Sequence, residues 1–446
     1  ETVLLLHSTA AGNKQWRKLI ELLSSSYRIL APNLYGYGTT PSWSQPNRQT
    51  LADHVSLLEG ILADEPKINI VGHSFGGSVA MMAAKIHKPK VNKLILIEPN
   101  PFYLLSNNKD SDGYKEAVAL CDVIKRNGDK GTWNIAAQYF ADRVSGRTDG
   151  QLTIDKKPAG TLVGAFEVFD AVSAGQADLY HSAEYYFLGQ HPGLAYFTSV
   201  PFGMTGPEFM SWYYHNGGQE LHRELGSIFN LRPMIAGNTG HQPGGWFNKE
   251  INSAADLQGL KFRMPGFGGK ALGLTGASVQ NVPGGEIYQA LASGSIDGAE
   301  WIGPFADERL GFQEICKFYY TAGFHEPGSA LCASFNLDVY ESFTDTQKSI
   351  VETAAEATHS WNLAQSNANN GAALERLKAA GVKVMEFDDS IWEAFGKAAK
   401  EAQDAEMSDD LFATIRGSYE ASMASTYGWM GMSDGLYLQK RNKFLA

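Results

Sequence analysis

Cysteine is scarce in this chain, and its spacing excludes two common kinds of framework. The 446 residues contain three cysteines, Cys121, Cys316 and Cys332, which lie far apart and form no Cys-x-x-Cys pair. Such a pattern predicts neither a disulfide scaffold nor a structural zinc site. Apolar runs are short as well, and none approaches the roughly 18 residues that a helix needs to cross a bilayer. We therefore expect that the chain does not itself span a membrane.

Positive charge is also in deficit. The chain has 37 Lys+Arg against 48 Asp+Glu, a net charge of −11. Residues 1–145 hold 16 Lys+Arg and 13 Asp+Glu, so the remaining residues hold 21 and 35. A strongly acidic second part and a weakly basic first part argue against nucleic acid as a partner. The contrast also indicates two parts of different character.

No flexible linker separates these parts. The length is large for one domain and fits two, yet no Pro-, Gly- or Ser-rich stretch marks the join. The pattern changes within residues 136–155, and we place the boundary at residue 143, between domains 1–143 and 144–446. The first residues, ETVLLLHSTA, show neither an initiating Met nor a signal-peptide pattern. We therefore expect the natural start to lie upstream.

The first part alternates short apolar runs with stretches of helical spacing. Strands are predicted at residues 2–7, 27–33, 68–72 and 93–99, and helices at 13–26, 49–64 and 78–89. This alternation indicates α/β architecture with a parallel sheet.

A G-x-S-x-G motif follows the third predicted strand. Gly72-His73-Ser74-Phe75-Gly76-Gly77 stands between strand and helix, the context in which such a serine becomes a nucleophile on a sharp turn. Glycine is expected beside it because neighbouring backbone leaves no room for a side chain. The alternative is a glycine-rich turn with an incidental serine.

These residues resemble the α/β-hydrolase superfamily over residues 1 to about 143, including GTWNIAAQYFAD as a lid helix. The resemblance implies Ser74 as nucleophile, with the backbone N–H groups of Phe75 and of Ser8 or Thr9 as oxyanion donors. Glu98 stands where some members carry the triad acid, although such a residue more often binds local backbone.

The catalytic base has no clear candidate in this part. The superfamily places its histidine after the acid, but His87, the histidine that follows Ser74 here, is expected to be a surface or helix-capping residue. His7 and His73 belong to the oxyanion loop and the elbow, and His54 is predicted on an exposed helix. Serine without a base is a weak nucleophile, so the incomplete triad argues against an enzyme.

The second part again reads as α/β, with strand and loop candidates at residues 177–186, 195–204, 233–240, 260–266 and 297–304. Residues 161–175 are predicted helical, and FADRVSGRTDGQLTI also reads as a helix and a strand. Residues 345–381 form a long run without proline whose apolar residues are three and four apart. We expect one long helix there, either exposed or bracing two lobes.

Three blocks carry a specific resemblance: GNTGHQPGGWFNKEI, residues 256–304, and YYTAGFHEPG. They resemble the solute-binding proteins of tripartite ATP-independent periplasmic (TRAP) transporters, in the branch that binds 2-oxo acids and related monocarboxylates. The resemblance covers residue 139 to the C-terminus. It implies a two-lobed venus-flytrap fold, and the strand that opens this fold in the family has no counterpart here.

The resemblance also implies a site. Arg263 matches the arginine that grips the ligand carboxylate, and guanidinium suits this role because it forms two parallel bonds to a carboxylate. Gln242, Glu300 and Trp301 match a cation site, in which the backbone carbonyl of Trp301 takes part. Oxygen ligands favour Na⁺ or Ca²⁺, bound together with the ligand and without an organic cofactor.

Other residues of these blocks are weaker candidates. Tyr185 and Tyr186 would line the cleft, but aromatic pairs at strand ends are more often core. His325 and Glu326 stand in FHEPG, and we expect Glu326 to bind the ligand.

Three functions stay open. The first is a periplasmic solute-binding protein that captures a small 2-oxo or 2-hydroxy carboxylate with a cation for TRAP permease subunits. The second is a serine hydrolase built on Ser74. The third is a join of two truncated genes, in which neither part is complete.

Overall fold

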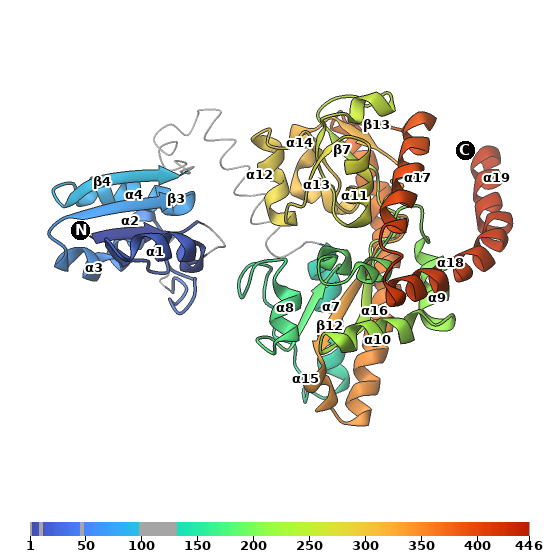
Figure 1. Cartoon of the computed structure of the whole chain (residues 1–446), viewed down its shortest axis with the longest axis horizontal. Helices are drawn as coiled ribbons and strands as arrows, with labels where there is room; N and C mark the ends of the chain where they lie inside the picture. The colour runs from blue at the N-terminus through green and yellow to red at the C-terminus, as the bar shows by residue number, and fades with distance from the viewer. Residues whose placement is uncertain (1, 9–11, 45–48, 98–131, 446) are drawn as a thin grey trace. The chain divides into compact units, whose positions relative to one another are not determined.

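The computed structural model describes residues 2–8, 12–44, 49–97 and 132–445. By their contacts, residues 1–122 and 157–165 form one compact unit, and residues 123–156 and 166–446 form a second. Both units combine helices with sheets (Figure 1), as the α/β pattern predicted.

The first unit is built on a parallel sheet in the order β2-β1-β3-β4. Its strands are β1 Thr2–Leu6, β2 Arg28–Leu30, β3 Ile68–His73 and β4 Val91–Ile97, and its helices are η1 Asn13–Trp16, α1 Arg17–Leu23, α2 Leu51–Leu57, α3 Glu59–Asp64 and α4 Phe75–Ile86. All of β1 is buried, because a parallel strand is covered by helices on both faces. The four predicted strands are confirmed.

One prediction in this unit is wrong. His54 was expected on an exposed helix face, but its side chain is buried. Its ring packs against Tyr35 and Phe75, with centroids 5.6 and 5.1 Å away. Imidazole presents an apolar body that can join such a cluster, so helical spacing alone did not show which way it faces.

The second unit has two lobes, and the first is built on a sheet in the order β5-β12-β6 with antiparallel pairs. These strands are β5 Leu179–Ser182, β6 Leu231–Asn238 and β12 Ala330–Asn336. The surrounding helices are α7 Thr132–Arg147, α8 Val168–Ser173, η2 Glu184–Phe187, η3 Pro192–Phe197, α9 Gly206–His215, α10 Gly218–Ile228 and α15 Leu337–Glu341.

The second lobe has a mixed sheet in the order β13-β11-β7-β10-β8-β9. Its strands are β7 Gly245–Phe247, β8 Lys261–Arg263, β9 Ser278–Gln280, β10 Gly298–Ala299, β11 Phe318–Tyr320 and β13 Lys383–Met385. Its helices are η4 Ala254–Leu257, α11 Gly266–Leu274, η5 Gly284–Glu286, α12 Ile287–Ala292, α13 Pro304–Leu310 and α14 Phe312–Ile315. The strands are short, and the loops at their ends carry most of the polar residues discussed below.

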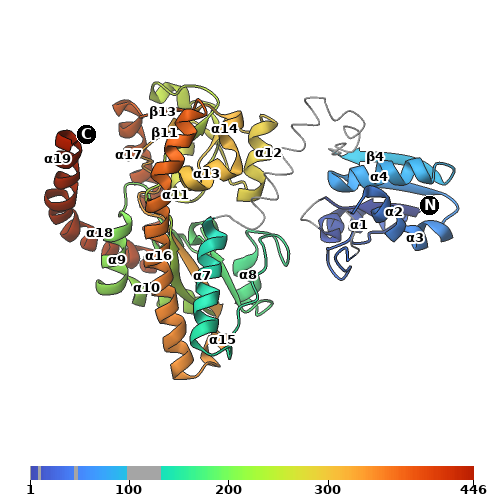
Figure 2. The same cartoon turned by 180° about the vertical axis from the view of Figure 1, so that it is seen from behind.

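The long helix predicted from sequence is α16 Asp345–Ala379. It begins with a capping box, in which Gln347 N donates to Thr344 Oγ1 and Thr344 N donates to Gln347 Oε1. It packs on β6 of the first lobe and on α13 of the second, so it braces both lobes (Figure 2). The chain ends with α17 Asp389–Asp404, α18 Asp410–Met430, a π turn at Gly431–Gly435 and α19 Leu436–Leu445, which has no buried residue.

Helix α7 runs through residue 143. It packs on α16 and β6, and the Tyr139 ring stacks on the Trp361 ring with centroids 4.0 Å apart. The described residues that resemble a hydrolase lid helix therefore belong to the second unit. The boundary at residue 143 stays a prediction.

Three other local predictions differ from the structure. Residues 195–204 contain no strand, because η3 occupies the first of them, up to Phe197. This helix begins where His191 Nδ1 accepts the N–H of Gly193. Residues 150–154 contain no strand either, and within residues 161–175 only α8 is helical. Among the described residues, no helix is both long and apolar enough to cross a membrane.

Candidate ligand and cation site

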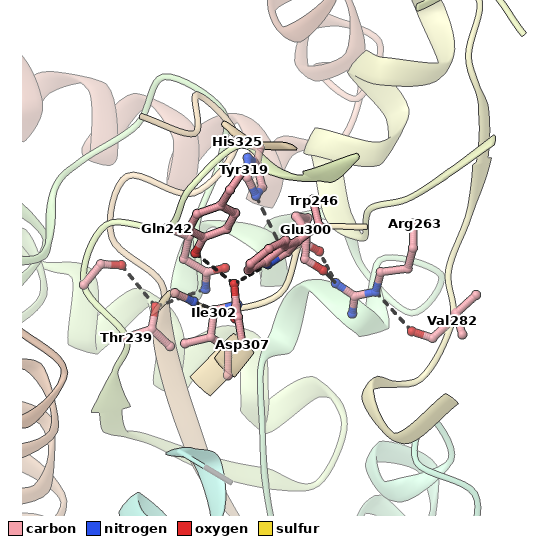
Figure 3. Close-up of polar contacts among 12 residues, drawn as sticks. Thr239, Gln242, Trp246, Arg263, Val282, Glu300, Ile302, Asp307, Tyr319 and His325 are labelled. Carbon is pink, nitrogen blue, oxygen red and sulfur yellow. Dashed lines mark hydrogen bonds and ion pairs between the residues drawn. The ribbon is translucent and has the colours of Figure 1, made fainter. Parts of the chain in front are cut away.

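The predicted arginine lies at the end of a second-lobe strand. Arg263 closes β8 and is fully buried. Its Nε donates to the Val282 carbonyl at 3.1 Å, and its Nη1 donates to the Glu300 carbonyl at 3.2 Å and to Glu300 Oε1. Its Nη2 donates to the Tyr186 hydroxyl at 2.8 Å. The guanidinium therefore donates hydrogen bonds to three residues, Val282, Glu300 and Tyr186. Its carboxylate partner in this structure is Glu300 (Figure 3).

Two carboxyl groups and an imidazole lie together beside this arginine. One ligand atom from each of Glu300, His325 and Glu326 lies within 4.8 Å of the others, and all three residues are buried. Burial raises the pKa of Glu300 to about 7, although Arg263 opposes this rise. Burial and the charge of Glu300 raise the pKa of Glu326 to about 7. Burial lowers the pKa of His325 to about 4, so its ring is neutral at pH 7.

Several buried polar atoms here have no hydrogen-bond partner. They are Gln242 Oε1, Glu300 Oε2, Glu326 Oε2 and both ring nitrogens of His325, although His325 Nε2 lies 3.5 Å from Glu300 Oε2. A buried polar group left unpaired costs about 1–3 kcal/mol. Carboxylate and amide oxygens are the donors that Na⁺ and Ca²⁺ prefer. These residues therefore fit a bound hard cation.

The orientation of Gln242 follows from its own contacts. Its Nε2 donates to Thr239 Oγ1 at 3.0 Å, and the Thr239 hydroxyl donates to the Gly240 carbonyl at 3.1 Å (Figure 3). Its Oε1 is thereby left without a partner. The backbone N–H of Gln242 donates to the Glu326 carbonyl at 3.0 Å, so two loops of the site are joined directly.

Aromatic rings surround the guanidinium. Its central carbon lies 5.3 Å from the Trp301 ring and 5.9 Å from the Tyr186 ring. The Tyr185 and Tyr186 rings stand nearly perpendicular, with centroids 4.7 Å apart. Gly284 makes room for the indole, because a Cβ there would lie 2.0 Å from Trp301 Cη2. Both tyrosines come from η2 of the first lobe, so residues of both lobes meet at Arg263.

The structure thus brings the predicted residues together from separate loops, while their roles as ligands stay predictions. Sequence reasoning gave little weight to His325 and missed Thr239 and Asp307. A signal for Asp307 exists in GPFADE, where an acid follows a proline at a helix start.

In the first unit, the serine lies on a strained turn. Ser74 has a φ of 51° between β3 and α4, a conformation that non-glycine residues adopt rarely. A Cβ on Gly76 would lie 2.2 Å from the Leu6 carbonyl oxygen, and one on Gly72 would lie 2.5 Å from that of Gly76. These are the close approaches expected at a nucleophile elbow.

The neighbours of this serine do not complete a catalytic set in the described residues. Both nitrogens of His7 have other contacts, Nδ1 with the Ser8 carbonyl at 2.8 Å and Nε2 with the Leu34 N–H at 3.0 Å. His87 is the C-cap of α4, whereas Ser74 is its N-cap. These two residues therefore lie at opposite ends of the helix.

The proposed oxyanion loop has its own hydrogen bonds. The N–H of Ser8 donates to Gln15 Oε1 at 2.9 Å, and Gln15 Nε2 lies 3.2 Å from His73 Nδ1. Phe75 is the first residue of α4, and its role as a donor stays a prediction. Thr9 and Glu98 lie outside the described residues.

Comparison with known families decides the identity of the larger part. The model of the bacterial extracellular solute-binding proteins of family 7 matches residues 125–410. The chain belongs to this family. The monocarboxylate 2-oxoacid-binding periplasmic protein of Nostoc sp. is 38% identical over 304 residues, which cover 68% of this chain and 84% of that protein.

Solved structures of TRAP solute-binding proteins agree. A TRAP transporter solute-binding protein from Bordetella bronchiseptica, with calcium and picolinate, has a TM-score of 0.69 at 32% identity and covers 70% of this chain and 94% of its own. One from Pseudoalteromonas atlantica, with sodium and pyruvate, has a TM-score of 0.67 at 37% identity and covers 69% and 94%. The venus-flytrap fold expected from the sequence is confirmed.

Residues 1–120 match the α/β hydrolase fold model. The 2-hydroxymuconate semialdehyde hydrolase of Pseudomonas sp. is 31% identical over 101 residues, which cover 21% of this chain and 35% of that enzyme. The chain therefore spans about a third of the length of this hydrolase. A partial hydrolase fold precedes the family 7 solute-binding part, as the sequence predicted.

Proposed function

We propose that the second unit binds a small 2-oxo or 2-hydroxy monocarboxylate together with Na⁺ or Ca²⁺, in the periplasm, for delivery to TRAP permease subunits. The observation that carries this proposal is the buried set of unpaired oxygens on Gln242, Glu300 and Glu326 beside Arg263. The ligands and cations of the Nostoc, Bordetella and Pseudoalteromonas proteins support it.

The charges suggest how a ligand would bind. Arg263 carries one positive charge, Glu300 and Glu326 carry two negative charges when ionised, and His325 is neutral at pH 7. A divalent cation and one monocarboxylate would leave this buried set neutral, which lowers the cost of burying charge. The ligand carboxylate would replace Glu300 Oε1 on Arg263, and Glu300 would turn to the cation with Gln242 Oε1 and the Trp301 carbonyl.

Sodium would achieve the same neutrality differently. With one positive charge fewer, one of the two carboxyl groups would keep its proton, and the pKa values of Glu300 and Glu326, both about 7, allow this. The two cations should therefore displace different numbers of protons when they bind with the same ligand.

A thermal-shift titration tests the proposal. The whole chain is titrated with pyruvate, longer 2-oxo acids and lactate, with Ca²⁺, with Na⁺ and with chelator. A ligand at a hundred times its Kd stabilises the folded state by about 2.7 kcal/mol, so a clear rise in melting temperature is expected with ligand and cation together.

Two arginine variants localise the effect. Arg263→Ala should abolish the shift, whereas Arg376→Ala, which removes an exposed ion pair between Arg376 on α16 and Glu308 on α13, should keep it. An unchanged shift in Arg263→Ala would reject this site. A chain that shows no cooperative unfolding and no shift would instead support two incomplete parts.

The strained turn at Ser74 favours a second candidate, serine hydrolysis by the first unit. The turn presents the serine, but His7 is engaged elsewhere and His87 lies at the far end of α4. Turnover of p-nitrophenyl esters by the intact protein, compared with Ser74→Ala, tests it. Equal rates would remove Ser74 from consideration, and a rate that disappears in the variant would establish it as the nucleophile.

A further inference from the structure

One buried carboxylate accepts four hydrogen bonds just outside the candidate site. Asp307, in the first turn of α13, is 1% exposed. Its Oδ1 accepts the backbone N–H groups of Ile302 and Gly303 at 3.1 and 2.9 Å. Its Oδ2 accepts Trp246 Nε1–H and the Tyr319 hydroxyl, both at 2.9 Å (Figure 3).

These donors come from three separate segments, and each segment carries a candidate ligand. Ile302 and Gly303 directly follow Glu300 and Trp301. Trp246 lies in β7, four residues after Gln242. Tyr319 lies in β11, six residues before His325 and seven before Glu326. One side chain therefore connects the three loops that form the site.

The loops also contact one another through their backbones. The N–H of Gly244 donates to the Tyr320 carbonyl at 2.7 Å, and the N–H of Gly323 donates to the Gln242 carbonyl at 3.0 Å. These bonds join the Gln242 loop to the His325 loop. The strands β10, β7 and β11, next to these three segments, are also neighbours in the sheet, and Asp307 contacts all three segments, including the one that carries Glu300, through a single side chain.

A carboxylate suits this position for a chemical reason. An ionised carboxylate only accepts hydrogen bonds and offers about four lone pairs, whereas an amide of the same shape offers one accepting oxygen. The indole N–H can only donate, so it needs an acceptor. The start of a helix also favours negative charge. Burial raises the pKa of Asp307 to about 6, and the four hydrogen bonds oppose this rise.

We propose that Asp307 is a positioning residue for the cation: its carboxylate holds the loops of Gln242, of Glu300 and Trp301, and of His325 and Glu326 at the spacing that one ion requires. This inference rests on the proposed function of the same site. Asp307 does not touch the cation; it acts through the segments that it connects.

The alternative is a helix cap with no effect beyond α13. Asp256 provides the matched control, because it accepts the N–H groups of Asn252 and Ser253 at 2.9 and 3.0 Å at the start of η4 in the same lobe. It is a capping acid whose hydrogen bonds come from Asn252 and Ser253, outside the three site segments.

The main test compares Asp307→Asn with Asp256→Asn in the full chain. Pyruvate binding is measured by calorimetry while the Ca²⁺ concentration is varied. In Asp307→Asn the Ca²⁺ concentration for half-saturation should rise at least tenfold, and excess Ca²⁺ should restore pyruvate binding. Asp256→Asn should match the wild type. Restoration by cation separates a positioning defect from a general loss of folded protein.

A second measurement does not depend on any ligand. Hydrogen exchange should become faster in Asp307→Asn at residues 302–303 and also in the loops of residues 239–245 and 321–329. Faster exchange confined to residues 302–303, or an unchanged Ca²⁺ requirement, would reduce Asp307 to a helix cap and overturn the inference. If the wild type binds neither Ca²⁺ nor pyruvate, the proposed function fails, while exchange still decides whether Asp307 connects the loops.

Tyr319→Phe keeps the inference testable if Asp307→Asn fails to fold. This variant retains the ring and removes one hydroxyl donor to Asp307. Its Ca²⁺ requirement should rise by a few-fold, less than in Asp307→Asn. A Ca²⁺ requirement equal to that of the wild type would contradict a role for this contact.

Discussion

Each lobe of the second unit buries a carboxylate–imidazole cluster, and the two differ in one respect. In the first lobe, His222 Nε2 lies 2.5 Å from Glu184 Oε2, the Tyr180 hydroxyl donates to Glu184 Oε1 at 3.0 Å, and the Tyr213 hydroxyl lies 3.1 Å from His222 Nδ1. Every one of these polar atoms has a partner. In the second lobe, Glu300, His325 and Glu326 are as deeply buried but retain unpaired atoms.

The completeness of the hydrogen bonds distinguishes a structural cluster from a candidate binding site, whereas the residue types of the two clusters do not. With Cys332, the first cluster also has a composition that could ligate a metal ion, but its hydrogen bonds are complete within the protein. A fully paired buried network contributes to a unique core. Unpaired buried oxygens next to a guanidinium have no such explanation, and a ligand with its cation would pair them.

The largest effect is expected when the first-lobe cluster loses a member. We call this cluster, made of Glu184, His222, Tyr180, Tyr213 and Cys332, the paired cluster. Glu184→Ala leaves His222 and Tyr180 without their shared partner, and removal of one member of a buried pair costs about 3–5 kcal/mol. Denaturant unfolding should show this loss, with Glu401→Ala, an exposed acid on α17, as control. A change within 0.5 kcal/mol, about what surface sites show, would mean that this cluster does not stabilise the lobe.

A change in the second-lobe cluster of Glu300, His325 and Glu326, the unpaired cluster, should instead weaken ligand binding without lowering stability. Glu326→Gln removes a carboxylate whose ionisation is disfavoured by burial and by Glu300. The free energy of unfolding of the ligand-free protein should therefore not fall at pH 8. Cation-dependent ligand binding should weaken about 10- to 100-fold, because a contact to a charged group contributes about 1.5–3 kcal/mol. Unchanged affinity with lower stability would place Glu326 in the core instead.

The pH dependence of binding sharpens the comparison further. The ligand-free carboxyl groups of Glu300 and Glu326 have pKa values of about 7, and by the charge balance proposed above Ca²⁺ requires both of them ionised whereas Na⁺ requires one. Protons and cation therefore compete, so affinity should fall about tenfold per displaced proton as the pH drops from 8 to 6. Calorimetry in buffers of different ionisation enthalpy counts these protons, and Ca²⁺ should displace more than Na⁺.

The stability of the ligand-free protein should have the reverse dependence. A carboxyl group whose pKa is raised on folding holds its proton more tightly in the folded state than in the unfolded chain. The contribution of the unpaired cluster to stability should therefore decrease as the pH rises from about 4.5 to about 7 and level off above the folded pKa. Thermal melts with and without ligand and Ca²⁺ should show this dependence only without them.

The smallest expected effect concerns the cysteine of the paired cluster. Burial and the neighbouring Glu184 raise the pKa of Cys332 well above its usual value, so the thiol stays protonated and is a poor metal ligand. Cys332→Ala should cost about 1 kcal/mol as a small cavity, and the purified protein should contain no zinc. Stoichiometric zinc that Cys332→Ala abolishes would show that the paired cluster is a metal site.

The sequence predicted the parts of the fold that show a regular hydrophobic period or match long blocks of a known family. The strands of the first unit and α16 followed from period and length. The matching blocks predicted that Arg263, Gln242, Glu300 and Trp301 would lie together, and their roles as ligands stay predictions. Contacts between distant segments were beyond it. No spacing indicates that Asp307 reaches Trp246 and Tyr319, or that His54 packs inward, because these depend on how separate elements meet.

The hydrogen bond between Tyr186 and Arg263 has a consequence for the kinetics of the protein. Tyr186 comes from one lobe and Arg263 from the other, so this contact exists only while the lobes are together. Separation of the lobes therefore requires this contact to break. If the proposed ligand leaves through separated lobes, a Tyr186→Phe variant, which loses this hydroxyl acceptor, should release it faster than the wild type.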